Sequence, residues 1–268
     1  MAMSTESEAG SKALPRASSS TGPKEAIIAP ATAPAARSVA VPRLALVSTW
    51  IILANVVIYA ANMFTMQVVQ TPQGNLTTSG LLFALGNFNF NQTILQGQVW
   101  RFVTFQFLHN PHGLMHLGFN MAMLWMIAPV VEEKMRAARF VVFYLACGVA
   151  GPIMLMLLNR LGVLVDPGWT AQPLVGASAG VFGVLVAAAI VAPIEEIELI
   201  FPPIPMLLRQ FVMIMIAVAC AVVFGAGYQA QRNNAGGEAA HLGGAVVGYL
   251  LTRRMLAPTA SNTKPLPL

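Results

Sequence analysis

A serine and a histidine lie in two stretches that are otherwise built almost entirely from apolar and glycine residues. Ser178 lies within LVGASAGVFGVLVAAAIVA, and His241 lies within EAAHLGGAVVGYLLT. A nucleophilic or ionisable side chain inside a membrane span is costly to keep there, so it is a functional candidate by default. A serine hydroxyl becomes a useful nucleophile when an imidazole accepts its proton. The pair therefore predicts nucleophilic catalysis inside a membrane, with Ser178 as nucleophile and His241 as general base.

A second pair of polar residues could support that chemistry. His116 and Asn120 are four residues apart, so they project from one face of a helix. Both side chains can donate hydrogen bonds, and such donors stabilise the negative oxygen that develops when a serine attacks an amide. Backbone N–H groups at a helix start near Ser178 could serve the same oxygen. The alternative interpretation is that His116 and Asn120 join helices by hydrogen bonds, as polar residues in membrane bundles often do.

Small residues accompany both the serine and the histidine. Two glycines flank Ser178 at a four-residue spacing, and two more follow His241 at the same spacing: Gly176, Gly180, Gly244 and Gly248. Such faces let helix backbones approach closely. A short serine side chain needs that approach to come within about 2.6–3.2 Å of an imidazole. Ordinary packing explains one such face, but two faces that each carry half of a nucleophile–base pair favour catalysis.

The sequence around His241 offers few further partners. Phe182 lies four residues after Ser178 and shares its helix face, so it can pack on the His241 ring, although core packing alone also explains a phenylalanine there. Glu238 precedes His241 by three residues and could touch it, but we expect it to be a solvated loop residue. No Asp or Glu falls within the predicted spans. The sequence therefore favours a Ser178–His241 dyad over a triad.

The composition predicts an integral membrane protein. The 268 residues are 56% hydrophobic and 9% charged, with a mean hydropathy of +0.68, whereas a soluble domain carries about 25% charged residues. The net charge of +5 is spread along the chain rather than gathered in one patch, so we expect no nucleic-acid partner. Cys147 and Cys220 both fall in apolar runs and are expected to be core residues rather than a disulfide.

The apolar segments predict an all-α membrane protein with a six-transmembrane-helix domain over residues 44–256. Residues 1–43 are rich in Ala, Ser, Pro and Thr and predict a disordered cytoplasmic tail, and residues 257–268 form a second cytoplasmic tail. The predicted spans, each near the roughly 20 residues that cross a bilayer, are 44–64, 112–130, 139–158, 177–192, 206–226 and 239–256.

Basic residues set the expected orientation. They gather before the first span, between the second and third, near the start of the fifth and at the end of the sixth: Lys24, Arg37, Arg43, Lys134, Arg136, Arg139, Arg209, Arg253 and Arg254. The positive-inside rule then places both termini in the cytoplasm. Spans two, four and six run inward, and each carries its polar residues near its start. His116, Asn120, Ser178 and His241 are therefore expected at a similar depth, a few residues below the outer surface.

The connection between the first two spans, residues 65–111, is too long for a plain turn. It contains the apolar and aromatic runs GLLFALGNF and VWRFVTFQFLH. Irregular backbone cannot face lipid, but short helices can lie in the interface. We expect an interfacial, partly immersed loop with Trp100 and Arg101 at headgroup level, although Trp100 alone would also fit simple aromatic anchoring.

These features together resemble the rhomboid family of intramembrane serine proteases. The matching elements are Trp100-Arg101, His116-x3-Asn120, GASAGVFG at 176–183 and AHLGGAVVG at 240–248, in the family's order and within residues 44–256. The resemblance implies a six-helix rhomboid-type bundle that needs no metal or cofactor. It implies Ser178 as nucleophile and His241 as general base, with His116, Asn120 and the Ser178 backbone N–H as the oxyanion site. It also implies a water-filled depression above Ser178, and single-pass substrates with helix-destabilising small residues near the cut.

The chain departs from the family pattern in three places. Ala179 follows the serine where the family often has glycine, and Phe182 stands where some members have tyrosine. The segment FLHNPHGLMH has two more residues between His109 and His116 than the common family spacing. Either His109 or His112 can therefore correspond to an earlier family histidine that is structural rather than catalytic.

Two other functions compete with proteolysis. A catalytically inactive rhomboid-like factor that binds membrane proteins or controls their quality is the main alternative, but inactive relatives usually lose the serine or the histidine. A transporter would require inverted repeats and charged residues deep in the spans, and the sequence has neither. We therefore expect a multi-pass endopeptidase of a bacterial plasma (inner) membrane, whose partners are transmembrane protein substrates and the lipid bilayer.

Overall fold

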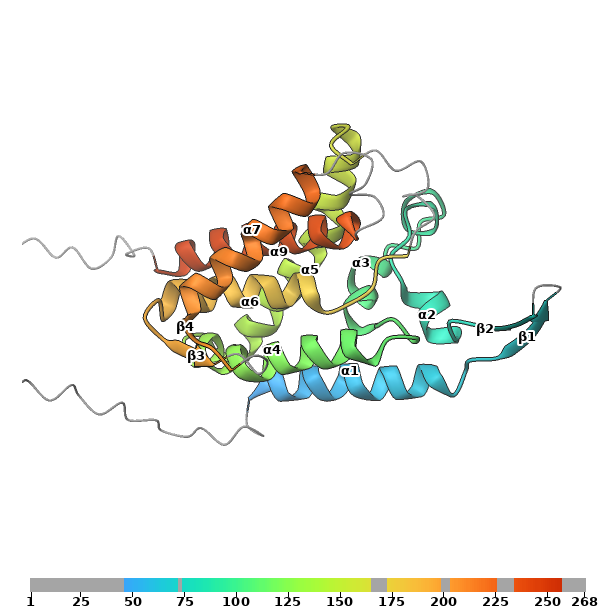
Figure 1. Cartoon of the computed structure of the whole chain (residues 1–268), viewed down its shortest axis with the longest axis horizontal. Helices are drawn as coiled ribbons and strands as arrows, with labels where there is room; N and C mark the ends of the chain where they lie inside the picture. Colours follow the sequence, from blue (N-terminus) through green and yellow to red (C-terminus); the bar gives the residue numbers. More distant parts are fainter. Residues whose placement is uncertain (1–45, 72–73, 165–172, 199–202, 226–233, 257–268) are drawn as a thin grey trace, which may run out of the picture. The chain divides into compact units, whose positions relative to one another are not determined.

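The computed structural model describes residues 46–71, 74–164, 173–198, 203–225 and 234–256. The predicted tails, residues 1–43 and 257–268, lie outside the described residues. The described part is mostly helical (Figure 1). Its long helices, of 14 to 24 residues, are α1 (Val47–Met63), α4 (Leu114–Glu132), α5 (Ala137–Arg160), α6 (Ser178–Val191), α7 (Leu208–Phe224) and α9 (Ala235–Leu256).

Each long helix overlaps one predicted span, but one boundary is wrong in a way that matters. Helix α9 begins at Ala235 rather than near residue 239, so Glu238 belongs to its first turn and is not a loop residue. Helices α4 and α5 are long and apolar enough to cross a membrane by length and composition, whereas α1, α6 and α7 are apolar but have 17 residues or fewer.

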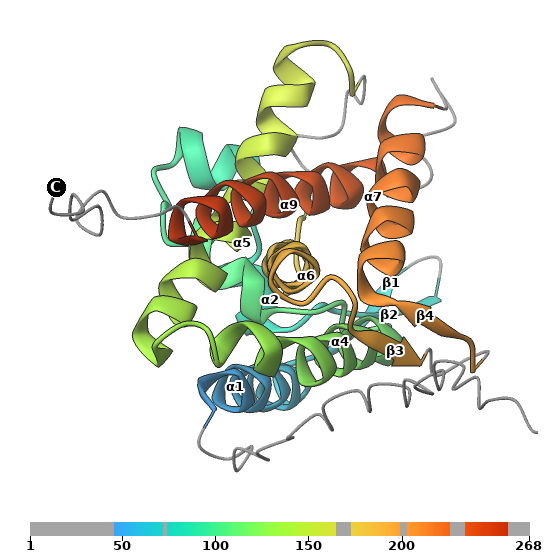
Figure 2. The same cartoon turned by 90° about the vertical axis from the view of Figure 1, so that its left-hand side faces the viewer.

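Helix α6 lies at the centre of the bundle. Figure 2 shows it end-on, surrounded by α4, α5, α7 and α9. Ten consecutive residues of α6, Ala179 to Ala188, are buried. A helix that is apolar on every side belongs in a core rather than at a surface, and the run AGVFGVLVAA supplies that surface. The first turn of α6, which carries Ser178, is therefore held by packing on several sides.

Glycines bring α9 against α5 and α6. A Cβ atom added to Gly248 would lie 2.6 Å from the Cα atom of Gly183 in α6, and one added to Gly244 would fall on the carbonyl group of Ala179. A Cβ atom on Gly243 would meet the carbonyl group of Ala150 in α5. Small residues allow such backbone contacts between membrane helices, so the glycines after His241 hold its helix directly against the helix of Ser178.

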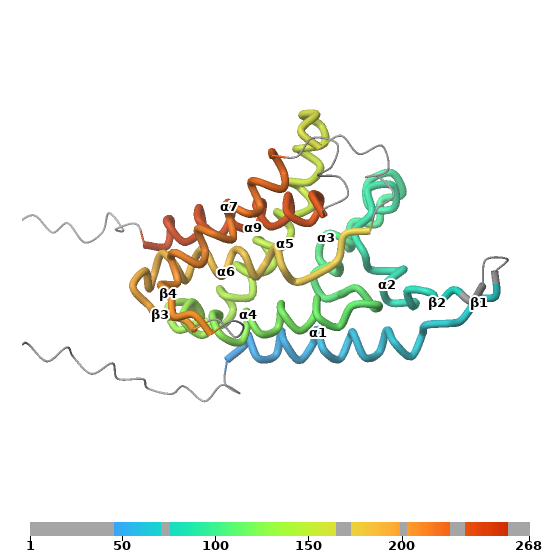
Figure 3. The backbone as a smooth tube through the Cα atoms, viewed as in Figure 1, coloured from blue at the N-terminus to red at the C-terminus, as the bar shows by residue number. Residues whose placement is uncertain are grey.

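The connection between α1 and α4 is a chain of short elements. They are the antiparallel hairpin of β1 (Val68–Thr71) and β2 (Gly74–Thr77), α2 (Leu81–Gly86), the π-helix η2 (Asn91–Leu95), α3 (Arg101–Thr104) and the 3₁₀-helix η3 (Phe105–Phe107). Figure 3 traces the chain from the end of α1 into the hairpin and back toward α4.

The Arg101 side chain joins several segments of this connection by hydrogen bonds. The residue is 2% exposed, and its guanidinium group donates to the backbone carbonyls of Asn87 and Ala84 at 2.7 and 2.9 Å. Its Nε donates to the side-chain oxygen of Gln98 at 2.7 Å. Trp100 is half exposed, and its indole N–H donates to the carbonyl of Leu85. Arg101 is therefore held inside the connection, because its donors are bonded to carbonyl groups there. The headgroup level expected for Trp100 and Arg101 stays a prediction.

The end of the bundle opposite β1 and β2 carries a second hairpin and a contact between α1 and α4 (Figure 1). The antiparallel hairpin of β3 (Glu196–Glu198) and β4 (Pro205–Leu207) joins α6 to α7 there (Figure 1). Glu132, the last residue of α4, accepts hydrogen bonds from the backbone N–H groups of Val47 and Ser48 at the start of α1. A carboxylate at a helix N-terminus satisfies free donors and complements the dipole, so α1 and α4 are tied together at this end.

Candidate active site

Ser178 is the first residue of α6, at the point where the chain turns from an extended segment into the helix. Gly176 makes this turn with φ +127°, in the region that disfavours side chains. A Cβ atom there would also lie 2.9 Å from the His116 ring and 3.7 Å from the Ser178 Oγ. The glycine therefore lets the α4 histidine approach the serine. Within the described residues, no hydrogen bond occupies the Ser178 backbone N–H, which points out of the helix start.

His241 lies on α9 with its ring held on two sides. The Phe182 ring stacks on it, with centroids 4.2 Å apart and planes 10° from parallel. The Glu238 carboxylate lies 2.8 Å from its Nδ1 atom. The three-residue spacing left this contact open, but the expectation that Glu238 is a solvated loop residue is wrong, because α9 begins before it and brings the two side chains together.

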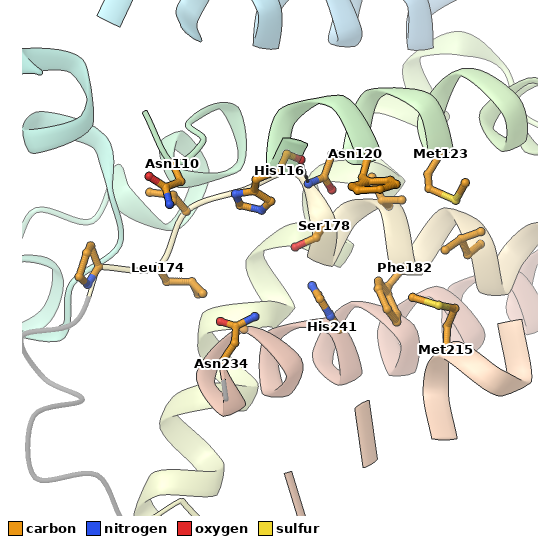
Figure 4. A pocket seen from close by; sticks show the side chains of 16 residues that line it. Asn110, His116, Asn120, Met123, Leu174, Ser178, Phe182, Met215, Asn234 and His241 are labelled. Atoms are coloured by element: carbon orange, nitrogen blue, oxygen red, sulfur yellow. Dashed lines mark hydrogen bonds between the residues drawn. The ribbon is translucent and has the colours of Figure 1, made fainter. Parts of the chain in front are cut away.

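The predicted catalytic and oxyanion residues share one cavity of about 480 Å³, which the four predicted packing glycines do not line. Ser178, His241, His116 and Asn120 all line it, and Figure 4 shows Ser178 between His116 and Asn120 on one side and His241 on the other. Within the described part of the chain, no hydrogen bond joins Ser178 Oγ to the His241 ring. Such bonds are often long without substrate and tighten only in the reacting complex.

Asn120 and His116 are arranged along one face of α4. The Asn120 side chain is buried, and its Nδ2 donates to the His116 backbone carbonyl at 2.8 Å. An amide nitrogen carries two hydrogens, so one remains for a ligand in the cavity. The His116 ring is half buried beside Gly176. Two side-chain donors from α4 thus border the space in front of Ser178.

His109 supports this arrangement from the preceding turn. The residue is 2% exposed, and its ring meets the His116 ring edge-on with centroids 5.0 Å apart, whereas His112 is exposed. The Ala177 backbone N–H, next to Ser178, lies 3.5 Å from His109 Nε2. Burial, and secondarily His116, lowers the pKa of His109 to about 3, so the ring is neutral and Nε2 can accept. His109 and His112 were the two candidates for the structural histidine of the family, and His109 is the one packed against the site.

Known proteins match this chain over the same elements. Residues 96–258 match the model of the Rhomboid domain, a range that contains all four polar site residues. The chain belongs to the rhomboid family. Rhomboid protease GluP of Bacillus subtilis is 29% identical over 187 residues, which cover 70% of this chain and 32% of GluP. Rhomboid-like protease 3 of Toxoplasma gondii is 24% identical over 202 residues, covering 75% of this chain and 66% of the relative.

A third rhomboid relative extends the comparison to mitochondria. Rhomboid protein 1, mitochondrial, of Saccharomyces cerevisiae is 30% identical over 135 residues, covering 50% of this chain and 36% of the relative. The chain therefore spans one third to two thirds of the length of these rhomboid proteins. Membership of the rhomboid family implies a mostly helical protein embedded in a membrane.

Proposed function

We propose that this protein is an intramembrane serine endopeptidase that hydrolyses peptide bonds in or near transmembrane segments of membrane proteins. The observation that carries the proposal is the shared cavity, in which Ser178 at the start of α6 faces His241 on α9. Glycine contacts between the two helices fix their separation. The names of two relatives, which describe rhomboid proteases, agree with this function.

The reaction proceeds in two halves. Ser178 Oγ attacks the substrate carbonyl carbon while its proton passes to His241 Nε2. The negative oxygen is stabilised by the Ser178 backbone N–H and by the His116 and Asn120 side chains. The C–N bond then breaks, and the protonated imidazole gives its proton to the leaving nitrogen. A water molecule attacks the resulting ester in the same way, with His241 taking the water proton and returning it to Ser178 Oγ.

In this proposal the six long helices form a domain that crosses the membrane six times. Large apolar side chains are exposed on α1, α4, α5, α7 and α9; among them are Trp50, Met115, Val142, Met213 and Tyr249. So much exposed apolar surface is expected where lipid is the solvent. The connection between α1 and α4, with its short helices, then lies in the outer interface. The basic ends of the helices face the cytoplasm of a bacterial plasma membrane, together with both termini.

The length of α6 accounts for the depth of the nucleophile. Its 14 residues rise by about 1.5 Å each, or about 21 Å, whereas the hydrocarbon core is about 30 Å thick. Ser178 therefore lies below the outer surface, and the cavity admits the water that hydrolysis consumes. The deeper lining is apolar and includes Met123, Leu185 and Met215, which suits a transmembrane substrate. The substrate must unwind locally, because a stable helix hides its carbonyl groups.

The test is cleavage of reconstituted single-pass helices by matched variants. Ser178→Ala and His241→Ala are each expected to abolish cleavage while the protein stays folded. Ser79→Ala and His112→Ala are the controls, because the Ser79 hydrogen bond uses its backbone carbonyl and His112 is exposed outside the cavity. If Ser178→Ala cleaved at the wild-type rate, the mechanism would be wrong. Substrate binding without cleavage by the wild-type protein would favour the alternative, an inactive rhomboid-like binding or quality-control factor.

A further inference from the structure

The contact between Glu238 and His241 is short and shielded. Glu238 Oε2 lies 2.8 Å from His241 Nδ1, and the two side chains are only 20% and 15% exposed. Phe182 covers one face of the same ring. With one face stacked and Nδ1 engaged, the imidazole keeps Nε2 as the ring nitrogen available to Ser178.

The pair differs from an ordinary surface ion pair. Glu238 stands in the first turn of α9, beside Gly237, which lines the cavity. Among the residues that the structure describes, this is the only contact between an acidic side chain and a basic one, so the carboxylate is not shared with a wider network. Exposed helix pairs are mobile and contribute little, whereas this carboxylate meets a ring that is mostly buried and stacked on Phe182.

We infer that Glu238 positions His241 for catalysis, as the third member of a Ser178–His241–Glu238 array. The inference rests on the proposed function. A carboxylate can only accept hydrogen bonds, so it holds the proton of the neutral imidazole on Nδ1. That leaves Nε2 unprotonated and able to accept the proton of Ser178. When Nε2 takes that proton, the carboxylate stabilises the imidazolium, while the protons remain on the ring and Glu238 stays ionised.

A glutamate in the first turn also stabilises a helix through its dipole, which would be a purely structural role. Glu238→Gln separates the two roles, because glutamine fills the same space. Its amide group can donate to Nδ1, and the ring proton would then move to Nε2, where it blocks proton transfer. We expect kcat to fall by about tenfold to a hundredfold with KM unchanged.

The experiment compares the wild type with Glu238→Gln, Glu238→Ala and Ser178→Ala in liposomes containing one reconstituted transmembrane substrate. Glu133→Gln is the matched control, because Glu133 is exposed at the far end of α4. Both kcat and KM are measured, and ¹⁵N NMR of the imidazole reports the His241 tautomer. The wild type should carry the proton on Nδ1, and Glu238→Gln should carry it largely on Nε2.

The outcomes separate this inference from the proposed function. Wild-type kcat in Glu238→Gln, or a lower kcat with an unchanged tautomer, would overturn the positioning role. Thermal unfolding of each variant shows whether it is folded, and if Glu238→Ala does not fold, the isosteric Glu238→Gln decides. Cleavage by Ser178→Ala would instead overturn the proposed function itself. An inactive Ser178→Ala beside a fully active Glu238→Gln would overturn only the role of Glu238.

Discussion

Gly244→Ala tests whether the contact between α6 and α9 sets the catalytic geometry. The added Cβ atom would fall on the carbonyl group of Ala179, 2.7 Å from its carbon atom. Ordinary contact begins at 3.4 Å, so the helices must part by at least the difference, about 0.7 Å. Neither backbone can move aside by rotating a side chain. Because Ala179 follows Ser178 and Gly244 lies one turn from His241, the displacement acts directly on the proposed nucleophile and the proposed base.

The expected effects are measurable in both stability and rate. Overpacking of this kind costs about 1–3 kcal/mol of unfolding free energy. A displacement of about 1 Å between reacting groups costs about a hundredfold in rate. Cleavage of a reconstituted substrate and unfolding in detergent measure the two effects. Gly118→Ala is the control, because a Cβ atom there meets nothing within 4 Å. If Gly244→Ala matched Gly118→Ala in both assays, the close helix contact would have no role in catalysis.

Three further changes probe the surroundings of the site. Asn120→Ala should slow cleavage by up to about a hundredfold to a thousandfold, less if other oxyanion donors compensate, and an unchanged kcat would leave Asn120 with a packing role only. The pKa of His109 falls on folding from 6.5 to about 3, so between these pH values the unfolded state binds more protons than the folded state. The free energy of unfolding should therefore fall as the pH drops from 6.5 toward 3. His109→Gln should weaken this pH dependence in unfolding measurements made over a series of pH values. Arg101→Lys should lower the unfolding temperature and slow cleavage, because one ammonium group cannot replace the guanidinium bonds to Asn87 and Ala84; wild-type values for both would contradict this.

The helices and the polar side chains that share the cavity could be predicted because both depend on simple patterns. Long apolar runs locate the helices, and alternating direction places the starts of the second, fourth and sixth spans at the same membrane face. Ser178 and His241 do line one cavity. The stacking of Phe182 on His241 follows from the four-residue spacing of Phe182 and Ser178.

Contacts between residues distant in sequence, and one helix boundary, could not be predicted. The run Gly236-Gly237-Glu238 has the composition of a loop, yet packing of α9 on α5 and α6 extends the helix through it. The burial of Arg101 depends on carbonyl groups 14 and 17 residues away. Which histidine packs against His116 depends on the path of the turn that precedes it, and spacing alone does not define that path.

Covalent labelling of Ser178 tests the central claim most directly. A fluorophosphonate loses fluoride as serine Oγ bonds to its phosphorus, and the reaction requires a serine whose proton an adjacent base removes. Mass spectrometry of the labelled protein should find one adduct, on Ser178, with little or none in His241→Ala. A protein that cleaves its substrate without labelling at Ser178, or that labels equally in His241→Ala, would contradict catalysis by this serine and this histidine.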